Sequence, residues 1–313
     1  MRILMKKIFR EFRFNKFRSA IIILTVTLAV AMLVGFVNSK YTFDESLAAN
    51  QTKLNNAEIR IRLRTYIPRA NVSALEQEPS IRQAGINDLE GRIFEPSNVW
   101  FEGALHSAYL IGVDLEDNAI NTLHLQKGTK ELSANQVLVE QHFGNKMLGA
   151  GAQLGDSLGI LLGNQTINVT IGGFVADSDY YYIVEEQTGM PTMGKLAVIY
   201  FPLSRLQTLL GQGDQINEIL VKTTERSADA ARKATLALTT FLGNNIQTRI
   251  YWNSSPEKEM YNADAGAMDK MGVVFGIFGL IAGAIAIYNS LSKLVQAQRT
   301  HIGLYGALGA QQK

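Results

Sequence analysis

Two long apolar stretches without a charged residue dominate the hydrophobic pattern of this chain, at residues 20–37 and 271–291. As helices of 18 and 21 residues, they would be about 27 and 32 Å long, close to the hydrocarbon thickness of a bilayer. The pattern therefore predicts two transmembrane helices around a mostly polar segment, residues 38–270. A buried core helix is the alternative for either stretch, and a cleaved signal peptide is a further alternative for the first.

The distribution of charge predicts an orientation. Residues 1–19 carry a net +6 and residues 292–313 carry +3, so the whole-chain charge of +2 leaves −7 for residues 38–270. Positively charged flanks stay on the cytoplasmic side. We therefore expect a multi-pass protein of the plasma membrane, or of the inner membrane in a Gram-negative cell, with a cytoplasmic N-terminus and residues 38–270 outside. An acidic outer segment makes nucleic acid an unexpected partner.

Apolar residues recur at near-helical spacing within the basic N-terminal segment. They are Ile3, Leu4, Ile8, Phe9, Phe12 and Phe17. This pattern predicts a cytoplasmic amphipathic basic helix over residues 1–19 that lies on the membrane surface and contacts lipids. A solvated basic lead that only orients insertion is the alternative.

The outer segment begins with the period of a strand. From Glu58 to Arg64 the residues alternate, with Ile59, Ile61 and Leu63 on one face and three arginines on the other. Such alternation predicts a half-buried strand.

Several local signals follow. Asn71 is expected to cap a short helix through Leu75. Two apolar stretches between Leu158 and Val175 flank the turn sequence at residues 163–165, which predicts a hairpin. Further strands are expected at residues 108–115 and 136–140.

Strands and helices alternate from residue 196 onward, which predicts a layered arrangement. The expected strands are residues 196–201, 216–222 and 246–252, and the expected helices are residues 203–210 and 227–242. One face of the longer helix should pack against a sheet. This face carries Ala231, Ala234, Leu238, Phe241 and Leu242.

These elements predict an α+β extracytoplasmic domain between two transmembrane α-helices. A helix-on-sheet module would be built from both ends of the outer segment, with a β-rich insertion at about residues 90–195. Residues 254–270 contain both acidic and basic residues and form either a helical stalk or a charged linker.

Glycines form a stripe in the second apolar stretch. Gly272, Gly276, Gly279 and Gly283 are spaced by four, three and four residues, which places them within about 60° of one helix face. Small residues let two helix backbones approach closely in lipid. The stripe is therefore predicted to pack against another membrane helix.

The sequence offers little for catalysis. It has no cysteine and no G-x-x-x-x-G-K-[ST] phosphate loop, so any use of ATP would need a second protein. Four histidines, His106, His124, His142 and His301, do not have metal-ligand spacing. We expect a non-catalytic chain without a cofactor or metal of its own. Residues 177–179, Asp-Ser-Asp, lack the remaining ligands of a calcium loop, and the tyrosines at 180–182 are typical of a strand.

The stretch after the second apolar segment, QRTHIGLYGALGA at residues 298–310, resembles the coupling signature of ABC transporter permeases of the MacB and FtsX type. In the outer segment, YLIGVD at residues 109–114, residues 146–160 and VTIGGFV at residues 169–175 are similar to the MacB-type periplasmic core. The order of the predicted segments also resembles this family over nearly the whole chain.

The resemblance implies that a cytoplasmic segment, residues 292–313, docks on a separate ABC ATPase. The matching positions are Arg299, Ile302, Gly303, Ala307, Leu308, Gly309 and Ala310. His301 stands where the family usually has glutamate, and Gly306 stands where it usually has a basic residue. These two departures remove the ion pairs that the usual residues could make with the ATPase.

The resemblance further implies that ATP and magnesium bind to the partner ATPase and that motion passes from it to the outer domain. It implies a second permease copy, as a homodimer or with a similar permease, and makes a periplasmic adaptor a candidate partner. Family members have two further crossings, so we expect the protein to continue beyond Lys313.

A two-crossing receptor with an extracytoplasmic ligand-binding domain is the alternative function. A signalling linker after the second crossing should show heptads, whereas glycine at 303, 306 and 309 opposes a continuous coiled coil.

Overall fold

The computed structural model describes residues 16–307, except residues 148, 187, 193 and 194. The chain divides into two compact units. The helical unit comprises the residues up to Glu45 together with those from Ala263 onward, and the globular unit comprises Ser46–Asn262. Most of the expected interfacial helix, residues 1–15, lies outside the described residues.

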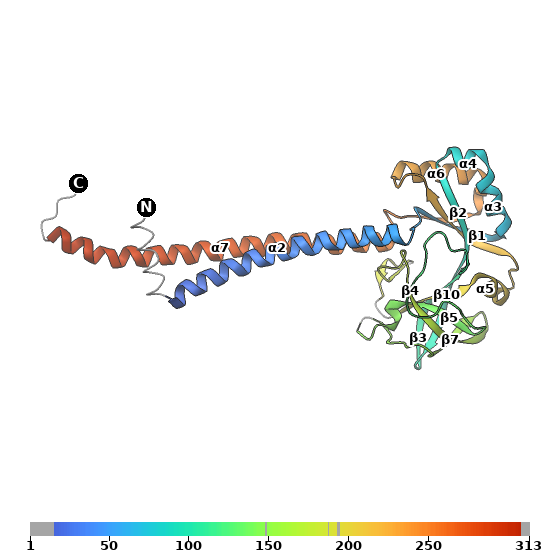
Figure 1. Ribbon diagram of the computed structural model, residues 1–313, viewed down its shortest axis with the longest axis horizontal. Coiled ribbons are helices and arrows are strands. Elements are labelled where there is room, and N and C mark those ends of the chain that lie inside the picture. Colours follow the sequence, from blue (N-terminus) through green and yellow to red (C-terminus); the bar gives the residue numbers. More distant parts are fainter. Residues whose placement is uncertain (1–15, 148, 187, 193–194, 308–313) are drawn as a thin grey trace. The chain divides into compact units, whose positions relative to one another are not determined.

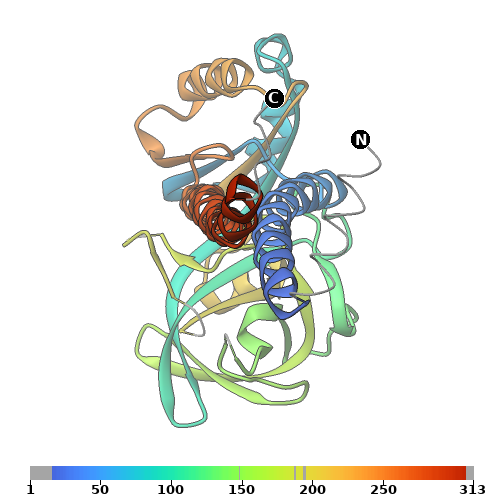
Figure 2. The ribbon, with the colours of Figure 1, turned by 90° about the vertical axis from the view of Figure 1, so that its left-hand side faces the viewer.

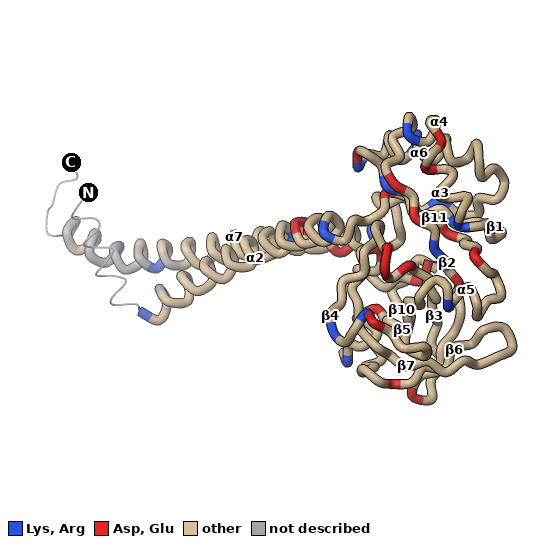
Figure 3. Tube along the Cα trace, turned by 45° about the vertical axis from the view of Figure 1, so that its right-hand side comes forward, with Lys and Arg blue, Asp and Glu red and all other residues tan. Residues whose placement is uncertain are grey.

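Two long helices form the helical unit, α2 (Lys16–Lys53) and α7 (Pro256–Ala307). Each contains a stretch that is long and apolar enough to cross a membrane. Most apolar side chains in these stretches are exposed, unlike those of a core helix. Figure 3 shows that charged residues are absent from long parts of both helices. Because α7 already begins at Pro256, the segment that precedes the second apolar stretch is helical and is not an irregular linker.

The globular unit combines a large mixed sheet with short helices (Figure 1). Its strands are β1 (Ile59–Pro68), β2 (Ile86–Phe101), β3 (Ala104–Val113), β4 (His124–Gly128), β5 (Gln136–Glu140), β6 (Ser157–Leu162), β7 (Gln165–Ala176), β8 (Val184–Glu185), β9 (Met190–Pro191), β10 (Leu196–Pro202), β11 (Gln215–Thr223) and β12 (Ile246–Tyr251). Its helices are α3 (Arg69–Gln77), α4 (Pro79–Gln83), α5 (Leu203–Leu210) and α6 (Ala228–Leu242), with 3-10 turns at Gln141–Gly144 and Gly243–Asn245.

One half of the globular unit is a helix-on-sheet module. Its strands pair antiparallel in the order β12, β1, β11 and β2, and α3, α4 and α6 gather beside them (Figure 1). The apolar face of β1 and the small residues of α6 share one hydrophobic core. Ser227 caps α6, because its Oγ accepts a hydrogen bond of 3.1 Å from the backbone N–H of Ala230.

The other half is a ring of strands. In the described part of the chain, β2, β3, β10, β5, β7 and β6 pair in this order, and β6 pairs again with β2. The long strand β2 belongs to both halves, because its first residues pair with β11 and its later residues pair with β3 and β6. Figure 2 shows the strongly curved course of these strands. Closure of the ring leaves few unpaired strand edges.

Many of the predicted elements are confirmed. β6 and β7 form the expected hairpin around residues 163–164, and α5 has the predicted bounds. The predicted strands and helix between residues 215 and 252 are present as β11, α6 and β12. An α+β domain with long apolar helices at both ends is therefore the fold of this chain.

Three local predictions are wrong. Asn71 does not cap α3, since the helix begins at Arg69 behind Pro68, whose extended backbone already supplies the boundary. Phe241 does not join the buried face of α6, because it is exposed and lines a surface groove with Ile67 of β1 and Leu75 of α3. The tyrosines at 180–182 lie in a loop before β8 and not in a strand.

Candidate functional site

A group of buried charged side chains lies where the module meets the ring. We call it the ionic cluster: Arg60 and Arg62 of β1, Arg92 of β2, Glu218 of β11, Glu257 in the first turn of α7, and Asp177, Asp179 and Glu186 of the segment 177–186 that follows β7. The half-buried strand that the alternation predicts is therefore only partly observed: Arg64 is exposed, whereas Arg60 is buried and Arg62 is partly buried. Arginines are buried here because acidic residues from other segments pair with them.

Arg60 contacts three carboxylates. Its Nη1 lies 3.6 Å from Asp179 Oδ2 and 3.4 Å from Glu186 Oε1, and its Nη2 lies 3.4 Å from Glu257 Oε2. Arg60 is only 4% exposed and Glu257 is 0% exposed. One guanidinium thus joins β1, the segment 177–186 and the start of α7.

Arg62 and Arg92 hold Glu218 between them. The Nε of Arg62 donates to Glu218 Oε1 at 2.9 Å, and the Nε of Arg92 donates to Glu218 Oε2. Burial alone would raise the pKa of Glu218, but the charges of Arg92, Arg62 and Arg60 lower it to about 2. Arg92 also donates to Asp179 Oδ2 at 3.1 Å, which ties this part of the cluster to the same segment.

The cluster contains more carboxyl groups than guanidinium groups, five against three. Burial, and then the nearby charge of Asp179, raise the pKa of Asp177 to about 7. Burial also raises the pKa of Glu257, although Arg60 opposes this change. The cluster can therefore hold a proton near neutral pH, which offsets part of its excess negative charge.

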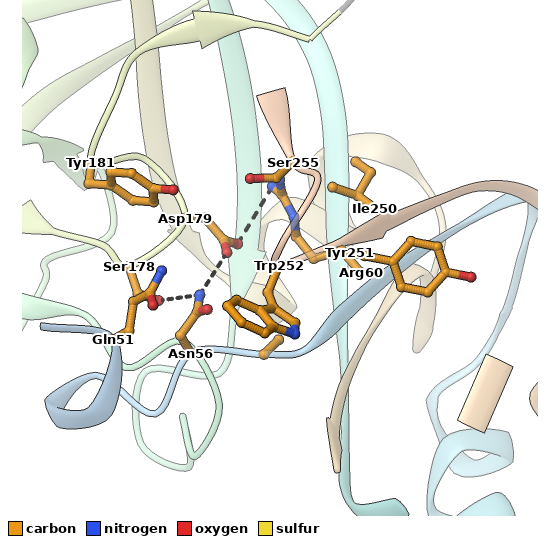
Figure 4. Close-up of a pocket in the computed structure, with 11 residues that line it drawn as sticks. Gln51, Asn56, Arg60, Ser178, Asp179, Tyr181, Ile250, Tyr251, Trp252 and Ser255 are labelled. Carbon is orange, nitrogen blue, oxygen red and sulfur yellow. Dashed lines mark hydrogen bonds and ion pairs between the residues drawn. The ribbon is translucent and has the colours of Figure 1, made fainter. Parts of the chain in front are cut away.

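Amide side chains extend the cluster toward the end of α2. Asn56 Nδ2 donates to Ser178 Oγ at 3.0 Å and to Asp179 Oδ1 at 3.2 Å (Figure 4). Asn121 Nδ2 donates to Asp179 Oδ2 at 2.6 Å, and its Oδ1 accepts from the backbone N–H of Ala57 at 2.7 Å. The residue Asp179 is thus fixed from several sides.

The cavity beside these residues is small. Asn56, Arg60, Tyr181 and Trp252 are among its lining residues, and its volume is about 10 Å³. A space of this size holds a single water molecule at most. Within the described residues, no group of three His, Asp or Glu side chains is arranged to hold a metal ion. The geometry of the ionic cluster is suited to joining β1, β2 and the start of α7 to the segment 177–186.

Sequence reasoning missed the cluster. The Asp-Ser-Asp sequence at residues 177–179 predicts no site, since it lacks the remaining ligands of a calcium loop, and the alternation in β1 gives no sign that Arg60 is buried. Arg60 and Asp179 are more than a hundred residues apart in the chain, so no local pattern connects them. One feature of the sequence could have indicated the cluster: three arginines lie on one predicted strand, and a pair of aspartates lies at residues 177 and 179.

The predicted glycine stripe lies against α2 in the helical unit. A Cβ placed on Gly272 would lie 3.2 Å from Phe36 Cβ, and one on Gly276 would lie 3.2 Å from Leu33 Cδ1. A Cβ on Gly279 would overlap Ala29, and one on Gly283 would lie 3.3 Å from a methyl group of Val26. The partner that the structure gives the stripe is therefore a helix of the same chain.

Two further contacts accompany the stripe. The rings of Phe36 and Phe275 stack with centroids 5.6 Å apart, and Lys40 Nζ lies 3.5 Å from Asp269 Oδ2. Together with the glycines, these contacts follow α2 and α7 along antiparallel directions. Close approach of backbones is the main source of helix association in lipid.

The predicted coupling residues are only partly described. Arg299, Gly303 and Ala307 lie in the last turns of α7 and are exposed, and Ile302 belongs to the same helix. Leu308, Gly309 and Ala310 lie outside the described residues. Docking of these residues on an ATPase stays a prediction.

Comparison with known proteins gives one family. The model of the MacB-like periplasmic core domain matches residues 19–238. No curated protein matches the chain.

Solved structures are similar to the chain at low identity, among them the following three. The extracellular domain of the noncanonic ABC-type transporter YknZ from Gram-positive bacteria is 14% identical, with a TM-score of 0.39 over 62% of this chain and 100% of that one. The periplasmic region of MacB from Actinobacillus actinomycetemcomitans is 13% identical, with a TM-score of 0.40 over 70% and 98%. A domain of a putative permease protein from Porphyromonas gingivalis is 15% identical, with a TM-score of 0.33 over 60% and 85%.

Proposed function

The chain belongs to the MacB-like periplasmic core domain family, and from this premise we propose that it is an ABC transporter permease subunit that relays motion from a separate cytoplasmic ATPase to its outer domain. In the family, such domains are parts of membrane-embedded transporters that work with a partner ATPase. The relay is an additional claim about how this chain works.

The course of α7 is the observation that supports the relay. This helix begins beside the ionic cluster, contains the second apolar stretch and continues to the coupling residues Arg299, Gly303 and Ala307 without a break. An uninterrupted helix is hydrogen-bonded along its whole length, so a displacement at one end is felt at the other. Gly303 and Gly306 are the residues in this last part that a helix tolerates least.

The membrane arrangement follows from the same proposal. Residues 20–37 and 271–291 would cross the plasma membrane, the N-terminus and residues 292–313 would be cytoplasmic, and residues 38–270 would be outside. A second permease copy would complete the assembly, and a periplasmic adaptor is a further candidate partner. ATP and magnesium would bind to the ATPase, so hydrolysis would not occur on this chain. The family match favours this function over a two-crossing receptor.

Co-purification with the ATPase encoded beside this protein tests the proposal. Leu308→Arg places a charge at a position where the coupling signature requires an apolar residue, so we expect it to abolish binding of the ATPase. Tyr305→Arg is the matched control, because it adds the same charge at a position that the signature leaves variable. Absence of binding by the unaltered full-length protein would reject the proposed function.

A further inference from the structure

The first turn of α7 contacts the segment 177–186 in two independent ways. The first is ionic, since Arg60 lies between Glu257 on one side and Asp179 and Glu186 on the other. All four side chains are at least nine-tenths buried, so none of these charges can be hydrated without opening the site. A buried charge that loses its partner is strongly unfavourable.

The second contact is aromatic. Tyr181 and Tyr182 of the segment lie edge-on to the ring of Tyr261, one turn further along α7, with centroids 6.4 and 6.5 Å away. Edge-to-face pairs at this distance add a directional attraction to the burial of the rings. Because Tyr261 and Glu257 are four residues apart, they lie on the same face of the helix and meet the segment together.

Glu257 depends on Arg60 in this contact. Its side chain is fully buried, and its Oε2 lies 3.4 Å from the guanidinium of Arg60. Removal of the Glu257 charge therefore leaves the buried Arg60 with fewer anionic partners, which is unfavourable.

We propose that Arg60 is a positioning residue that couples the first turn of α7 to the segment 177–186. Through Arg60, the two parts pack into the globular unit together and detach from it together, as one cooperative unit. Release of Glu257 opens the buried site to water, and the ion pairs of Arg60 with Asp179 and Glu186 weaken with it. The consequence for transport rests on the proposed function: motion of α7 would reach the strand ring through Arg60. The packing of the first turn of α7 against the segment 177–186 does not itself need an ATPase.

Hydrogen exchange on the full-length protein in lipid nanodiscs tests the cooperative unit without nucleotide or ATPase. Glu257→Gln keeps the shape of the side chain and removes its charge. We expect amide exchange to accelerate by roughly tenfold in residues 257–261 and also in residues 180–186, as for residues that share one network. Acceleration confined to residues 257–261 would overturn the proposal.

Two further variants sharpen the test. Tyr261→Leu loosens the same turn without a change of charge and should accelerate exchange in residues 180–186 as well, which covers the case that Glu257→Gln does not fold. Asp114→Asn breaks the ion pair with Arg69, 2.8 Å long and elsewhere in the globular unit, and should leave residues 180–186 unchanged. If these residues accelerate equally in Asp114→Asn, the effect is general destabilisation and the proposal fails. The two tests are independent. If the cooperative unit is rejected by hydrogen exchange, the unaltered protein should still bind the ATPase, whereas a protein that does not bind the ATPase rejects the proposed function.

Discussion

Tyr200 Oη donates a hydrogen bond of 2.6 Å to Asp177 Oδ2, and both side chains are buried. A second carboxylate, Asp179, is two residues away, and its oxygens accept hydrogen bonds from Asn56, Asn121 and Arg92. Burial, and then the charge of Asp179, raise the pKa of Asp177 to about 7, although the hydrogen bond from Tyr200 opposes this change.

Stability of the globular unit should fall as the pH rises from about 4 to 7. The pKa of Asp177 is about 7 in the folded protein and 3.8 without the fold, so the folded state holds a proton that the unfolded chain releases. One such proton gives a slope of about 1.4 kcal/mol per pH unit at most. Thermal unfolding at pH 5 and pH 8, followed by tryptophan fluorescence, measures it, because Trp100 and Trp252 both lie in the globular unit.

Asp177→Asn isolates this effect. Asparagine resembles the protonated carboxyl group, so the variant should lose less stability between pH 5 and pH 8 than the unaltered protein. The raised pKa of Glu257 acts in the same direction, but it is present in both proteins and cancels in the comparison. Asp117→Asn, at an exposed position, should leave the pH dependence unchanged. Equal losses in Asp177→Asn and the unaltered protein would show that Asp177 is not the group that titrates.

Arg92 and Glu218 should be energetically coupled. Arg92→Met leaves the fully buried Glu218 with fewer cations, and we expect a loss of about 3 kcal/mol in the free energy of unfolding. Glu218→Leu should also destabilise the protein, whereas the double variant should cost less than the sum of both, by about 1–3 kcal/mol. Denaturant unfolding of the four proteins gives the coupling. Arg92→Met combined with Asp114→Asn should be additive, and additivity in the Arg92 and Glu218 pair would contradict their ionic contact.

The glycine stripe can be tested with disulfides, since the chain has no cysteine of its own. A Cβ at Gly272 would lie 3.2 Å from Phe36 Cβ, close to the separation in a disulfide. The pair Phe36→Cys and Gly272→Cys should therefore cross-link readily. Adding Gly279→Leu should suppress the cross-link, because the new side chain would overlap Ala29.

Gly266→Leu is the control for this experiment. Gly266 is also in α7, but a Cβ there meets no atom within 4 Å. We expect this substitution to leave the cross-link intact. A cross-link that survives Gly279→Leu would mean that the stripe does not set the distance between α2 and α7.

Much of the fold could be predicted because its signals are local. The apolar stretches of α2 and α7, the hairpin of β6 and β7 around residues 163–164, and the helix α6 behind Ser227 all follow from periodicity, turn residues and caps. Asn71 shows the limit of such signals, because the neighbouring Pro68 fixes the helix start first.

The candidate site could not be predicted in the same way. A strand with alternating arginines normally presents them to solvent, and Arg60 is buried only because Asp179, Glu186 and Glu257 come from two distant segments. Glu257 follows β12, which pairs with β1, and Asp179 and Glu186 follow β7, so the cluster depends on pairing between strands that are far apart in the sequence. The coupling residues, in contrast, were identified from resemblance and not from physical pattern.

The relay from ATPase to outer domain is tested most directly by hydrogen exchange in residues 177–186 of the full-length protein assembled with its ATPase. The nucleotide-free complex is compared with a complex in which a hydrolysis-deficient ATPase holds ATP. The account predicts that ATP changes exchange in this segment, and that Leu308→Arg removes the change. Identical exchange in both states, with the ATPase bound, would contradict the relay.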